Sequence, residues 1–447
     1  MFEDTICALA TPHGVSGLAV VRVSGKNAIC AVDEYFIGKS KLKNCASHTI
    51  HYGKFVFEET IIDSITASVF ISPHSYTGED TIEIGLHGNT LIAQQIVDIL
   101  QNKGVRAATA GEFTKRAYLN GKIDITQVEA IADLLHSQTI PGTRLAAQQL
   151  YGGLTNAMKS LKEQLLSICA LLEIELDFSE EDLEFAQRND IIQLLESVKK
   201  HTKDMMSSYT SAQLYRSGFY IGLIGYPNSG KSSLFNSLLG KNRAIVSSVE
   251  GTTRDFLEES LFINGFKVTI ADTAGIRETD DIIEIEGIKF AHNIITMSDI
   301  LFLINDVSLG DNHSNDLLKS LTMKFPDKEI ILIQNKSDLV NHREFSEITI
   351  SAKHQKGIDI LKDFISNKIA SISDYGNDYM INSRHYSYCQ LIINDIESAI
   401  SAIKNHVTTE LVTIDIRSAI THIGSLLGES QEDEVLNTIF SRFCIGK

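Results

Sequence analysis

Five short motifs follow one another between Gly225 and Lys353, and each contains residue types that can bind phosphate, magnesium or a purine base. In chain order they are Gly225-Tyr-Pro-Asn-Ser-Gly-Lys-Ser232, Gly251-Thr-Thr-Arg-Asp255, Asp272-Thr-Ala-Gly275, Asn335-Lys-Ser-Asp338 and Ser351-Ala-Lys353. The first is typical of a phosphate-binding loop, where backbone N–H groups and a helix N-terminus face the anion. We expect Lys231 to reach the β- and γ-phosphates and the Ser232 hydroxyl to ligate Mg²⁺. One motif could arise by chance, but five in this order predict a nucleoside triphosphate site.

The fourth motif predicts that the base is guanine. The Asp338 carboxylate can accept hydrogen bonds from the guanine N1–H and N2–H₂ groups, which adenine does not offer, and a purine that leaves this carboxylate unpaired should be rejected strongly. We expect Asn335 to brace the loop, Lys336 to lie along the base and the Ala352 N–H to face O6. The sequence therefore predicts GTP rather than ATP as the ligand.

The third motif bears on hydrolysis. Asp272 is expected at the end of a strand, where its carboxylate can hold Mg²⁺ through water, and Gly275 is small enough to bring a backbone N–H to the γ-phosphate. The next residue is Ile276, whereas Ras has a glutamine that orients the attacking water. Hydrolysis must then use another side chain, or the site is a slow switch. The residues predicted to contact GTP are Asn228, Ser229, Gly230, Lys231, Ser232, Ser233, Ser247, Ser248, Val249, Glu250, Gly251, Thr252, Thr253, Asp272, Thr273, Ala274, Gly275, Asn335, Lys336, Asp338, Ser351, Ala352 and Lys353.

Asn228 suggests how hydrolysis could proceed without that glutamine. It is a polar residue inside the phosphate loop, and the run Ser247-Ser-Val-Glu-Gly-Thr-Thr253 offers backbone carbonyls beside it. Together they could hold a monovalent cation where an arginine finger would otherwise place positive charge. The alternative is that Asn228 only packs the loop.

Apolar periodicity predicts the strands and helices that position these motifs. The strand-like runs are Phe219–Gly225, Leu257–Ile263, Phe266–Asp272, Ile300–Ile304 and Ile330–Ile333. Lys231–Leu239 is predicted to be a helix that stops at Gly240, so the phosphate loop lies between a strand and a helix. An Asn264-Gly265 pair between two strand-like runs predicts a β-hairpin. Residues 216–370 are therefore predicted to form a Ras-like P-loop GTPase domain.

The flanking segments show two further patterns. Before residue 119, strand-like runs with turn residues and one helical stretch predict a compact α/β domain over residues 1–118. Residues 119–215 and 371–447 have helical periodicity and predict one helical domain that residues 216–370 interrupt. The expected fold class is α/β multidomain, with an N-terminal α/β domain, a discontinuous helical bundle and an inserted Ras-like P-loop GTPase domain.

The composition is that of a globular protein and limits its partners. The chain has 447 residues, 43% of them hydrophobic, and no apolar stretch approaches the ~20 residues that a membrane helix needs. Its N-terminus lacks the basic region of a secretory signal, so a cytoplasmic location is expected. The formal charge of −17 makes it a poor non-specific binder of nucleic acid, so a more basic partner would hold most of any RNA. The six cysteines are scattered without a C-x-x-C pair, which predicts reduced, mostly buried thiols for the five that precede Cys444.

Segments outside the GTPase motifs make the chain resemble a known family. They are Ala8-Leu-Ala-Thr-Pro12, Val21-Arg-Val-Ser-Gly25, Tyr76-Thr-Gly-Glu-Asp80 continuing to His87-Gly88, Gly111-Glu-Phe-Thr-Lys-Arg-Ala-Tyr-Leu-Asn-Gly121 and Ile439-Phe-Ser-Arg-Phe-Cys-Ile-Gly-Lys447. Along essentially its whole length the chain resembles the MnmE (TrmE) family of tRNA modification GTPases. The last string is the most specific, because GTPases at large have nothing like it.

The resemblance implies an N-terminal domain that binds a reduced folate one-carbon donor, a tetrahydrofolate derivative, and that dimerises with its copy. The implied folate contacts are Arg22, Glu83, Lys122 and Lys447. Arginine and lysine suit the carboxylates or carbonyls of a folate, and a carboxylate suits the donor edge of its pterin ring. Cys444 has two interpretations: a nucleophile that attacks a pyrimidine ring, or part of a tail that packs beside the folate pocket and positions Lys447.

The resemblance also implies how GTP is hydrolysed. Family members hold K⁺ with the phosphate-loop asparagine and the loop before the threonine pair. The corresponding residues are Asn228, Ser247, Val249 and Thr252. Mg²⁺ would be held by Ser232 and Thr253, and alignment with the family places the catalytic, water-positioning glutamate at Glu284. Two GTPase domains are expected to meet face to face when K⁺ and GTP are bound.

The implied function is a K⁺-stimulated GTP hydrolase that acts with the FAD-dependent partner MnmG (GidA) in a heterotetramer-type complex. Together they would convert C5 of the wobble uridine (U34) of certain tRNAs to a (carboxymethyl)aminomethyl-type group, with the partner holding most of the tRNA. The chain has no G-x-G-x-x-G fingerprint, so the flavin would reside on the partner. Two alternatives stay open: a ribosome-assembly GTPase of the Era or Der type, and a folate-dependent aminomethyltransferase with a regulatory GTPase attached.

Overall fold

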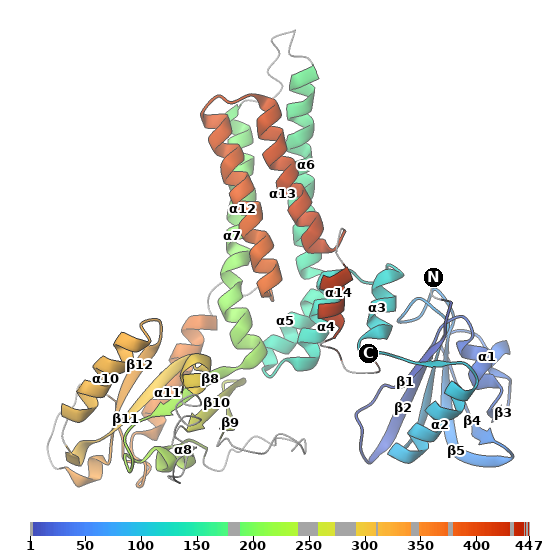
Figure 1. Cartoon of the computed structure of the whole chain (residues 1–447), viewed down its shortest axis with the longest axis horizontal. Helices are drawn as coiled ribbons and strands as arrows, with labels where there is room; N and C mark the ends of the chain where they lie inside the picture. Colours follow the sequence, from blue (N-terminus) through green and yellow to red (C-terminus); the bar gives the residue numbers. More distant parts are fainter. Residues whose placement is uncertain are drawn as a thin grey trace. The chain divides into compact units, whose positions relative to one another are not determined.

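The structure, a computed structural model, describes residues 3–177, 188–239, 258–272, 292–309, 312–340, 348–373, 379–429, 433–441, 443 and 446. The chain forms two compact units, and its helices and strands are labelled in chain order in Figure 1. The first unit consists of residues 1–132, 148–199 and 390–447, and the second of residues 133–147 and 200–389. The segment predicted to be the GTPase domain lies within the second unit.

The first unit contains a seven-stranded sheet with the order β3-β4-β5-β6-β2-β1-β7. Its strands are β1 (Ile6–Leu9), β2 (Ser16–Ser24), β3 (Phe36–Gly38), β4 (Thr49–Phe57), β5 (Thr60–Phe70), β6 (Thr81–Gly88) and β7 (Arg106–Ala107). Neighbouring strands are antiparallel except β1 and β7, which are parallel. Buried and accessible residues alternate along most of β5, so one face of the sheet faces a core.

Two helices cover the buried face of this sheet. They are α1 (Ala28–Asp33) and α2 (Thr90–Asn102). Val32 of α1 and Ile96 of α2 are fully buried and belong to one apolar core with Ile84 of β6. The N-terminal segment is therefore the α/β arrangement that its strand and helix signals predict.

A third helix, α3 (Glu112–Leu119), follows the sheet and packs against α14 (Asp433–Phe440) from the far end of the sequence. Gly111, directly before α3, has a φ of 68°, and a Cβ atom there would lie 2.8 Å from the Phe440 carbonyl oxygen. Glycine is required at this position both by the left-handed backbone and by the close approach of α14.

Long helices make up the rest of the first unit. They are α4 (Ile125–His136), α5 (Ile140–Leu150), α6 (Gly153–Asp177), α7 (Arg188–Ser217), α12 (Ser383–Lys404) and α13 (Thr409–Leu427), of which α4, α5, α7 and α12 contribute residues to both units. α6 and α13 lie side by side (Figure 1). Apolar residues spaced by three and four from Leu154 to Leu172 are buried along α6, as the helical periodicity predicts. None of the described helices is long and apolar enough to cross a membrane.

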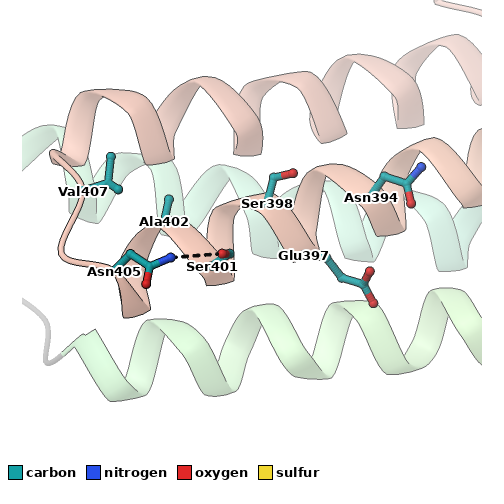
Figure 2. Close-up of a pocket in the computed structure, with 7 residues that line it drawn as sticks. All are labelled: Asn394, Glu397, Ser398, Ser401, Ala402, Asn405 and Val407. Carbon is teal, nitrogen blue, oxygen red and sulfur yellow. Dashed lines mark hydrogen bonds between the residues drawn. The ribbon is translucent and has the colours of Figure 1, made fainter.

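An open groove of about 630 Å³ runs along α12 (Figure 2). Asn394, Ser398 and Ser401 of this helix line it together with Asn405, which follows the helix, and Glu397 is the only charged residue among the described residues of the lining. Asn405 Nδ2 donates to Ser401 Oγ at 3.3 Å. None of the predicted site residues that the structure describes lines this groove.

The second unit contains a six-stranded sheet with the order β13-β12-β11-β8-β10-β9. Its strands are β8 (Phe219–Ile224), β9 (Glu258–Ile263), β10 (Phe266–Asp272), β11 (Ile300–Asp306), β12 (Glu329–Asn335) and β13 (Ile348–Thr349). All neighbours are parallel except the edge strand β9, which is antiparallel to β10. This is the strand order of a Ras-like GTPase domain, as the motifs predict.

The predicted hairpin is confirmed between β9 and β10. Asn264 and Gly265 have φ values of 51° and 82°, and a type I′ turn requires positive φ at both central residues.

Helices cover both faces of the second sheet. α8 (Lys231–Leu239) and α11 (Ile358–Ser373) pack on one face, and α10 (Asn312–Lys324) packs on the other. Even-numbered residues of β11 such as Phe302 belong to one core, and odd-numbered residues such as Leu303 belong to the other. A strand buried on both faces is expected inside a parallel sheet, and this is why its sequence is a continuous apolar run.

Candidate functional site

The carboxyl ends of parallel strands bring four of the five GTPase motifs to one edge of the second sheet. β8 ends at Ile224 directly before the phosphate loop, β10 ends at Asp272, and β12 ends at Asn335. β13 ends at Thr349, two residues before Ser351. In a doubly wound sheet, ligands bind outside this edge.

Backbone conformation shapes the phosphate loop, residues 225–232. Gly230 has a φ of 94°, and a Cβ atom there would lie 2.2 Å from Asn335 Nδ2. Gly225 has a φ of 155°, and a Cβ atom there would lie 2.5 Å from the Ile304 carbonyl oxygen. Both positions exclude a larger residue, because its side chain would meet a neighbour well inside contact distance.

Asn335 links the first, fourth and fifth motifs. Its side chain is buried, its Nδ2 donates to the Ser229 carbonyl at 2.9 Å, and its Oδ1 accepts the Ala352 N–H at 3.1 Å. A buried amide with both ends bonded holds the two loops in a fixed relation. The Ala352 N–H, which we predicted to face the base, is directed in this structure to the amide oxygen of Asn335, because that strong acceptor lies within hydrogen-bond distance.

Lys231 and Ser232 occupy the start of α8. The Lys231 side chain is buried, and its Nζ donates to the carbonyls of Gly225 at 2.8 Å and Tyr226 at 2.9 Å. Burial lowers the pKa of Lys231, and the nearby charge of Asp272 opposes this shift. Ser232 Oγ donates to Asp272 Oδ2 at 3.1 Å. A hydroxyl and a carboxylate side by side are hard oxygen donors of the kind that Mg²⁺ prefers, so these residues fit that ion.

Asp338 lies in a short 3₁₀ helix, η5 (Ser337–Leu339), that follows β12. One carboxylate oxygen accepts a hydrogen bond from Ser351 Oγ at 2.5 Å, and the other is 3.6 Å from His354 Nε2. The Ser351 hydrogen bond is the main cause that lowers the pKa of Asp338. The group is therefore ionised at neutral pH and can only accept hydrogen bonds, which is what recognition of guanine N–H groups requires.

Lys336 is held beside the same loop by an ion pair. Its backbone is left-handed, with a φ of 63°, and its Nζ lies 2.6 Å from Asp306 Oδ2 at the end of β11. Burial alone would raise the pKa of Asp306, but hydrogen bonds from Lys336 and Ser308 outweigh it and lower the pKa. The ion pair thus fixes the position of the Lys336 side chain next to the Asp338 loop.

Part of the predicted site lies outside the described residues. These residues are Ser247, Ser248, Val249, Glu250, Gly251, Thr252, Thr253, Thr273, Ala274, Gly275 and Glu284, together with Cys444 and Lys447 at the chain end. Of the remaining predicted GTP contacts, Ser233 lies in the first turn of α8 and Lys353 follows Ala352, and both side chains are exposed.

A second cluster of predicted residues lies in the first unit. Arg22 on β2 and Glu83 on β6 are directly opposite in register, and the Arg22 Nε and Nη2 atoms lie 2.9 and 2.8 Å from Glu83 Oε1. The guanidinium carbon lies 5.2 Å from the ring centre of Tyr76 and 5.5 Å from that of Phe113. Nη1 donates to the Gly446 carbonyl at 3.3 Å. We call these five residues the Arg22 cluster, in which an ion pair and two aromatic rings fix the guanidinium.

Lys122, which we predicted to bind the same ligand, has other neighbours. Its Nζ donates to the Pro73 carbonyl at 3.0 Å. Within the described residues it makes no hydrogen bond or ion pair with Arg22 or Glu83. It lies instead at a cavity of about 500 Å³ that Lys159 also lines.

Sequence reasoning missed a buried ionic network that joins α3 to the sheet. Arg116 on α3 is fully buried, and its guanidinium lies 2.7 Å from Asp4, 3.0 Å from Glu112 and 3.2 Å from Glu79. Glu79 also accepts a hydrogen bond from Ser24 Oγ of β2 at 2.8 Å. Buried charges are tolerated only when each is matched. Asp4 and Glu112 also pair with Arg106, so among the described residues loss of Arg116 would leave Glu79 without its cationic partner. The only sequence signal was the four-residue spacing of Glu112 and Arg116 on one helix.

Comparison with known proteins identifies the family. The model of the GTP-binding protein TrmE N-terminus matches residues 5–122, and the model of the MnmE helical domain matches residues 125–444. The tRNA modification GTPase MnmE of Flavobacterium psychrophilum is 38% identical over 461 residues that cover 100% of both chains. The MnmE of Acetivibrio thermocellus is 37% identical, covering 100% of this chain and 99% of its own. This chain belongs to the MnmE family of tRNA modification GTPases. Its fold class and its assignment as a GTP hydrolase are thereby confirmed.

The full-length similarity to MnmE proteins decides against the Era or Der alternative, which would resemble only the GTPase segment. A solved structure of Era from Aquifex aeolicus, bound to GDP and aluminium fluoride, is 26% identical over 33% of this chain and 56% of its own. Its TM-score of 0.27 is too low to support any argument.

We expect the buried network to make this MnmE protein acid-sensitive through Glu112. Burial alone would raise the pKa of Glu112, but hydrogen bonds from Arg106, from the Thr109 N–H and from Arg116 lower it to about 2. A carboxyl group with a lowered folded-state pKa stabilises the fold at pH values above its unfolded pKa, here 4.5. That stabilisation, about 3 kcal/mol, is lost as the pH falls from 4.5 towards 2.

The measurement is urea unfolding of the protein at pH 7 and at pH 3. The free energy of unfolding is taken from the transition that belongs to the first unit. The wild type should lose stability at pH 3, and Glu112→Gln should be less stable at pH 7 and depend less on pH. Glu163→Gln changes an exposed glutamate of α6 and should behave as the wild type. A Glu112→Gln variant with the full pH dependence of the wild type would contradict the assignment.

Proposed function

We propose that this chain is a K⁺-stimulated, Mg²⁺-dependent GTPase that modifies the wobble uridine of certain tRNAs together with the FAD-dependent protein MnmG (GidA). The product would be a (carboxymethyl)aminomethyl-type group on C5 of U34, with a tetrahydrofolate derivative as one-carbon donor. The observation that carries the proposal is that one chain contains two candidate sites. They are the GTPase motifs at the edge of the second sheet and the Arg22 cluster. Four of the five residues of the Arg22 cluster, all except Gly446, lie in the segment that matches the TrmE N-terminus model. The full-length relatives are named tRNA modification GTPases, which supports tRNA as the substrate.

The experiment is nucleoside analysis of tRNA from cells that lack this protein. The aminomethyl-type nucleoside at position 34 should disappear, and a plasmid copy of the gene should restore it. Unchanged wobble uridines in the deletion strain would overturn the proposal.

At the GTP site, the residues of this chain would bind the phosphates and position water. Lys231 and the loop N–H groups would hold the β- and γ-phosphates, and Ser232 with Thr253 would hold Mg²⁺. When bound, Mg²⁺ neutralises charge on the phosphate oxygens. The neighbouring Asp272 carboxylate would orient the Ser232 hydroxyl, with which it is already in contact. Glu284 would position the attacking water.

The exposure of Asn228 supports its assignment as a K⁺ ligand. Its backbone φ is 62°, its side chain is exposed, and in the described part of the chain it has no hydrogen-bond partner. The side-chain oxygen is therefore available to a ligand, as a K⁺ site at this position would require. Ser247, Val249 and Thr252 would complete the ligand set. The positive charge would then lie where other GTPases place an arginine.

GTP hydrolysis would be communicated to the helical domain through the β9–β10 hairpin, which lies in the sequence between the second and third motifs. The hairpin contacts residues 133–147 within the second unit. The Ile140 N–H donates to the Gly265 carbonyl at 3.2 Å, and Lys267 Nζ donates to Gln138 Oε1 at 2.6 Å. A shift of the hairpin would therefore act directly on the segment between α4 and α5.

The same segment is fastened to the end of α7. Thr139 Oγ1 donates to the Tyr215 carbonyl at 2.7 Å, and the Gln138 N–H donates to the Arg216 carbonyl at 3.3 Å. Arg216 Nε and Nη2 each donate to an Asp133 carboxylate oxygen at 2.7 Å. Residues from α4, α5 and α7 would thus move with the hairpin as one body.

Lys267→Met tests this connection, because it removes the bond to Gln138 while keeping most of the aliphatic stem. GTP hydrolysis should stay within about two-fold of the wild type, whereas tRNA modification with MnmG should fall by at least about five-fold, the lower end of typical coupling energies. Ser366→Ala is the matched control, because it removes a 2.6 Å bond between the hairpin residue Asn264 and α11. Parallel loss of both activities in Lys267→Met, or equal effects of the two variants, would contradict the connection.

The partners proposed for this chain follow its charge and its family. A net charge of −17 disfavours strong contact with tRNA phosphates, so MnmG would hold most of the tRNA and would carry the FAD. The chain would form a homodimer through its N-terminal domain and would work in the cytoplasm in a heterotetramer-type complex with MnmG.

A further inference from the structure

The end of the chain reaches the Arg22 cluster through Gly446. Its carbonyl accepts the Arg22 Nη1–H at 3.3 Å. Gly446 is buried and has a φ of 101°, and a Cβ atom there would lie 2.3 Å from the Leu9 carbonyl oxygen and 2.8 Å from Ala10 Cα. Two independent features, the left-handed backbone and the contact with β1, therefore require glycine.

Two described residues that precede Gly446 in the sequence, Phe440 and Phe443, are buried in the same unit. Phe440 and Phe443 are 3% and 5% exposed and lie in one apolar core with Ile125 and Val128 of α4. Phe440 also packs against the start of α3 at Gly111. Phe443 thus lies in a buried core, and Gly446 lies against β1 at the first sheet.

These contacts fix the orientation of the Arg22 guanidinium. Its Nε and Nη2 edge faces Glu83, its Nη1 faces Gly446, and aromatic rings lie close to it. A guanidinium recognises an anion or carbonyl with N–H groups in one fixed plane. Fixing that plane before the ligand arrives avoids the loss of side-chain freedom on binding.

We propose that Gly446 is a positioning residue for the folate site. It docks the chain end on β1, and its carbonyl holds the Arg22 guanidinium in the plane that receives a carboxylate or carbonyl group of the reduced folate. Gly446 acts through Arg22 and needs no contact with the ligand. The inference rests on the proposed folate function, but the docking itself can be tested without any folate.

The test compares Gly446→Ala with Gly104→Ala in the full-length chain. Gly104 has a φ of 88° but no atom within 4 Å of a Cβ at that position, so the control has the same backbone strain without the clash. Carboxypeptidase should release C-terminal residues at least about ten-fold faster from Gly446→Ala than from the wild type or the control, because a docked end is protected. Urea-unfolded chains, in which all three rates should be equal, correct for any effect on the protease.

Calorimetry with 5-formyl-tetrahydrofolate then tests the positioning role. Gly446→Ala should bind about ten-fold more weakly, as expected for loss of one hydrogen bond to a charged group, and its GTP hydrolysis should match the wild type. In an Arg22→Ala background, Gly446→Ala should cause no further loss, because its effect passes through Arg22.

The outcomes separate the two claims. Equal release from Gly446→Ala and the wild type overturns the docking. Faster release with unchanged folate affinity, or an additional loss in the Arg22→Ala background, overturns the positioning role. A wild-type chain that binds no folate overturns the folate function, while a difference in release still supports the docking.

Discussion

Asp338→Asn should change the preferred nucleotide from GTP to xanthosine triphosphate, with a change in the ratio of the two affinities of roughly a thousand-fold or more. The Asp338 carboxylate can accept from the N1–H and the amino group of guanine. Xanthine has a carbonyl in place of that amino group, and an asparagine amide can donate to it. The substitution keeps the size of the side chain, and the Ser351 hydroxyl, now 2.5 Å from Asp338 Oδ1, can still donate to the amide oxygen.

The measurement is competition of GTP and xanthosine triphosphate for a fluorescent guanine or xanthine nucleotide on the wild type and on Asp338→Asn. Asn335→Ala is the control, because Asn335 bonds to Ser229 and Ala352 and its loss should weaken both nucleotides alike. An Asp338→Asn variant that loses both nucleotides equally would show that Asp338 shapes the loop and does not read the base.

Local signals in the sequence were sufficient to predict most strands of the sheet in the second unit. The Asn264-Gly265 pair forms its turn because both residues adopt the positive φ that a type I′ turn requires. The apolar run that forms β11 lies inside the parallel sheet because it is buried on both faces. The first, third and fourth motifs begin at or just after the end of a predicted strand, so the parallel topology brings these three to one edge without further information, whereas no predicted strand directly precedes the second or the fifth motif. Such features depend on neighbours in the sequence, and periodicity and turn chemistry report those neighbours well.

Contacts between distant residues could not be predicted in this way. Arg116 meets Asp4 and Glu79 only because α3 packs on the sheet, and no spacing in the sequence relates those charges. The bond between Arg22 and Gly446 joins residues 424 positions apart. The family resemblance proposed Arg22, Glu83, Lys122 and Lys447 as folate ligands, but it gave no indication that Lys122 would donate a hydrogen bond to Pro73 instead of joining the Arg22 cluster.

The packing partners of the helical segments could not be predicted from the sequence either. Periodicity predicts that residues 119–215 are helical, and the helices are present. Periodicity shows that a helix has an apolar face, but it does not show which element that face will meet. Residues 133–147 thus pack with the GTPase sheet in the second unit, where Leu134 and Leu145 contact its core.

Asn228→Gly should abolish the stimulation of GTP hydrolysis by K⁺, lowering the rate in K⁺ by roughly a hundred-fold or more, to the rate of the wild type in Na⁺. A charge that replaces an arginine finger stabilises the transition state, and such fingers contribute roughly 10³- to 10⁵-fold. Glycine adopts the observed φ of 62° without strain, so a loss of activity would report the missing side-chain oxygen and not a distorted loop. GTP affinity should stay within a few-fold, since Lys231 and Asn335 are unchanged.

The measurement is the rate of GTP hydrolysis in K⁺ and in Na⁺ for the wild type, Asn228→Gly and Asn264→Gly. It tests whether the Asn228 side chain is a K⁺ ligand. Asn264→Gly is the matched control, because it makes the same substitution at another positive φ, 51°, in the hairpin turn. It should keep the full ratio of the K⁺ and Na⁺ rates. An Asn228→Gly variant that is slower in both salts but keeps this ratio would assign Asn228 to packing of the phosphate loop, and K⁺ would then need other ligands. Equal rates of the variant in the two salts would instead place the K⁺ site at this side chain, because only a lost ligand removes the difference between the ions while GTP still binds.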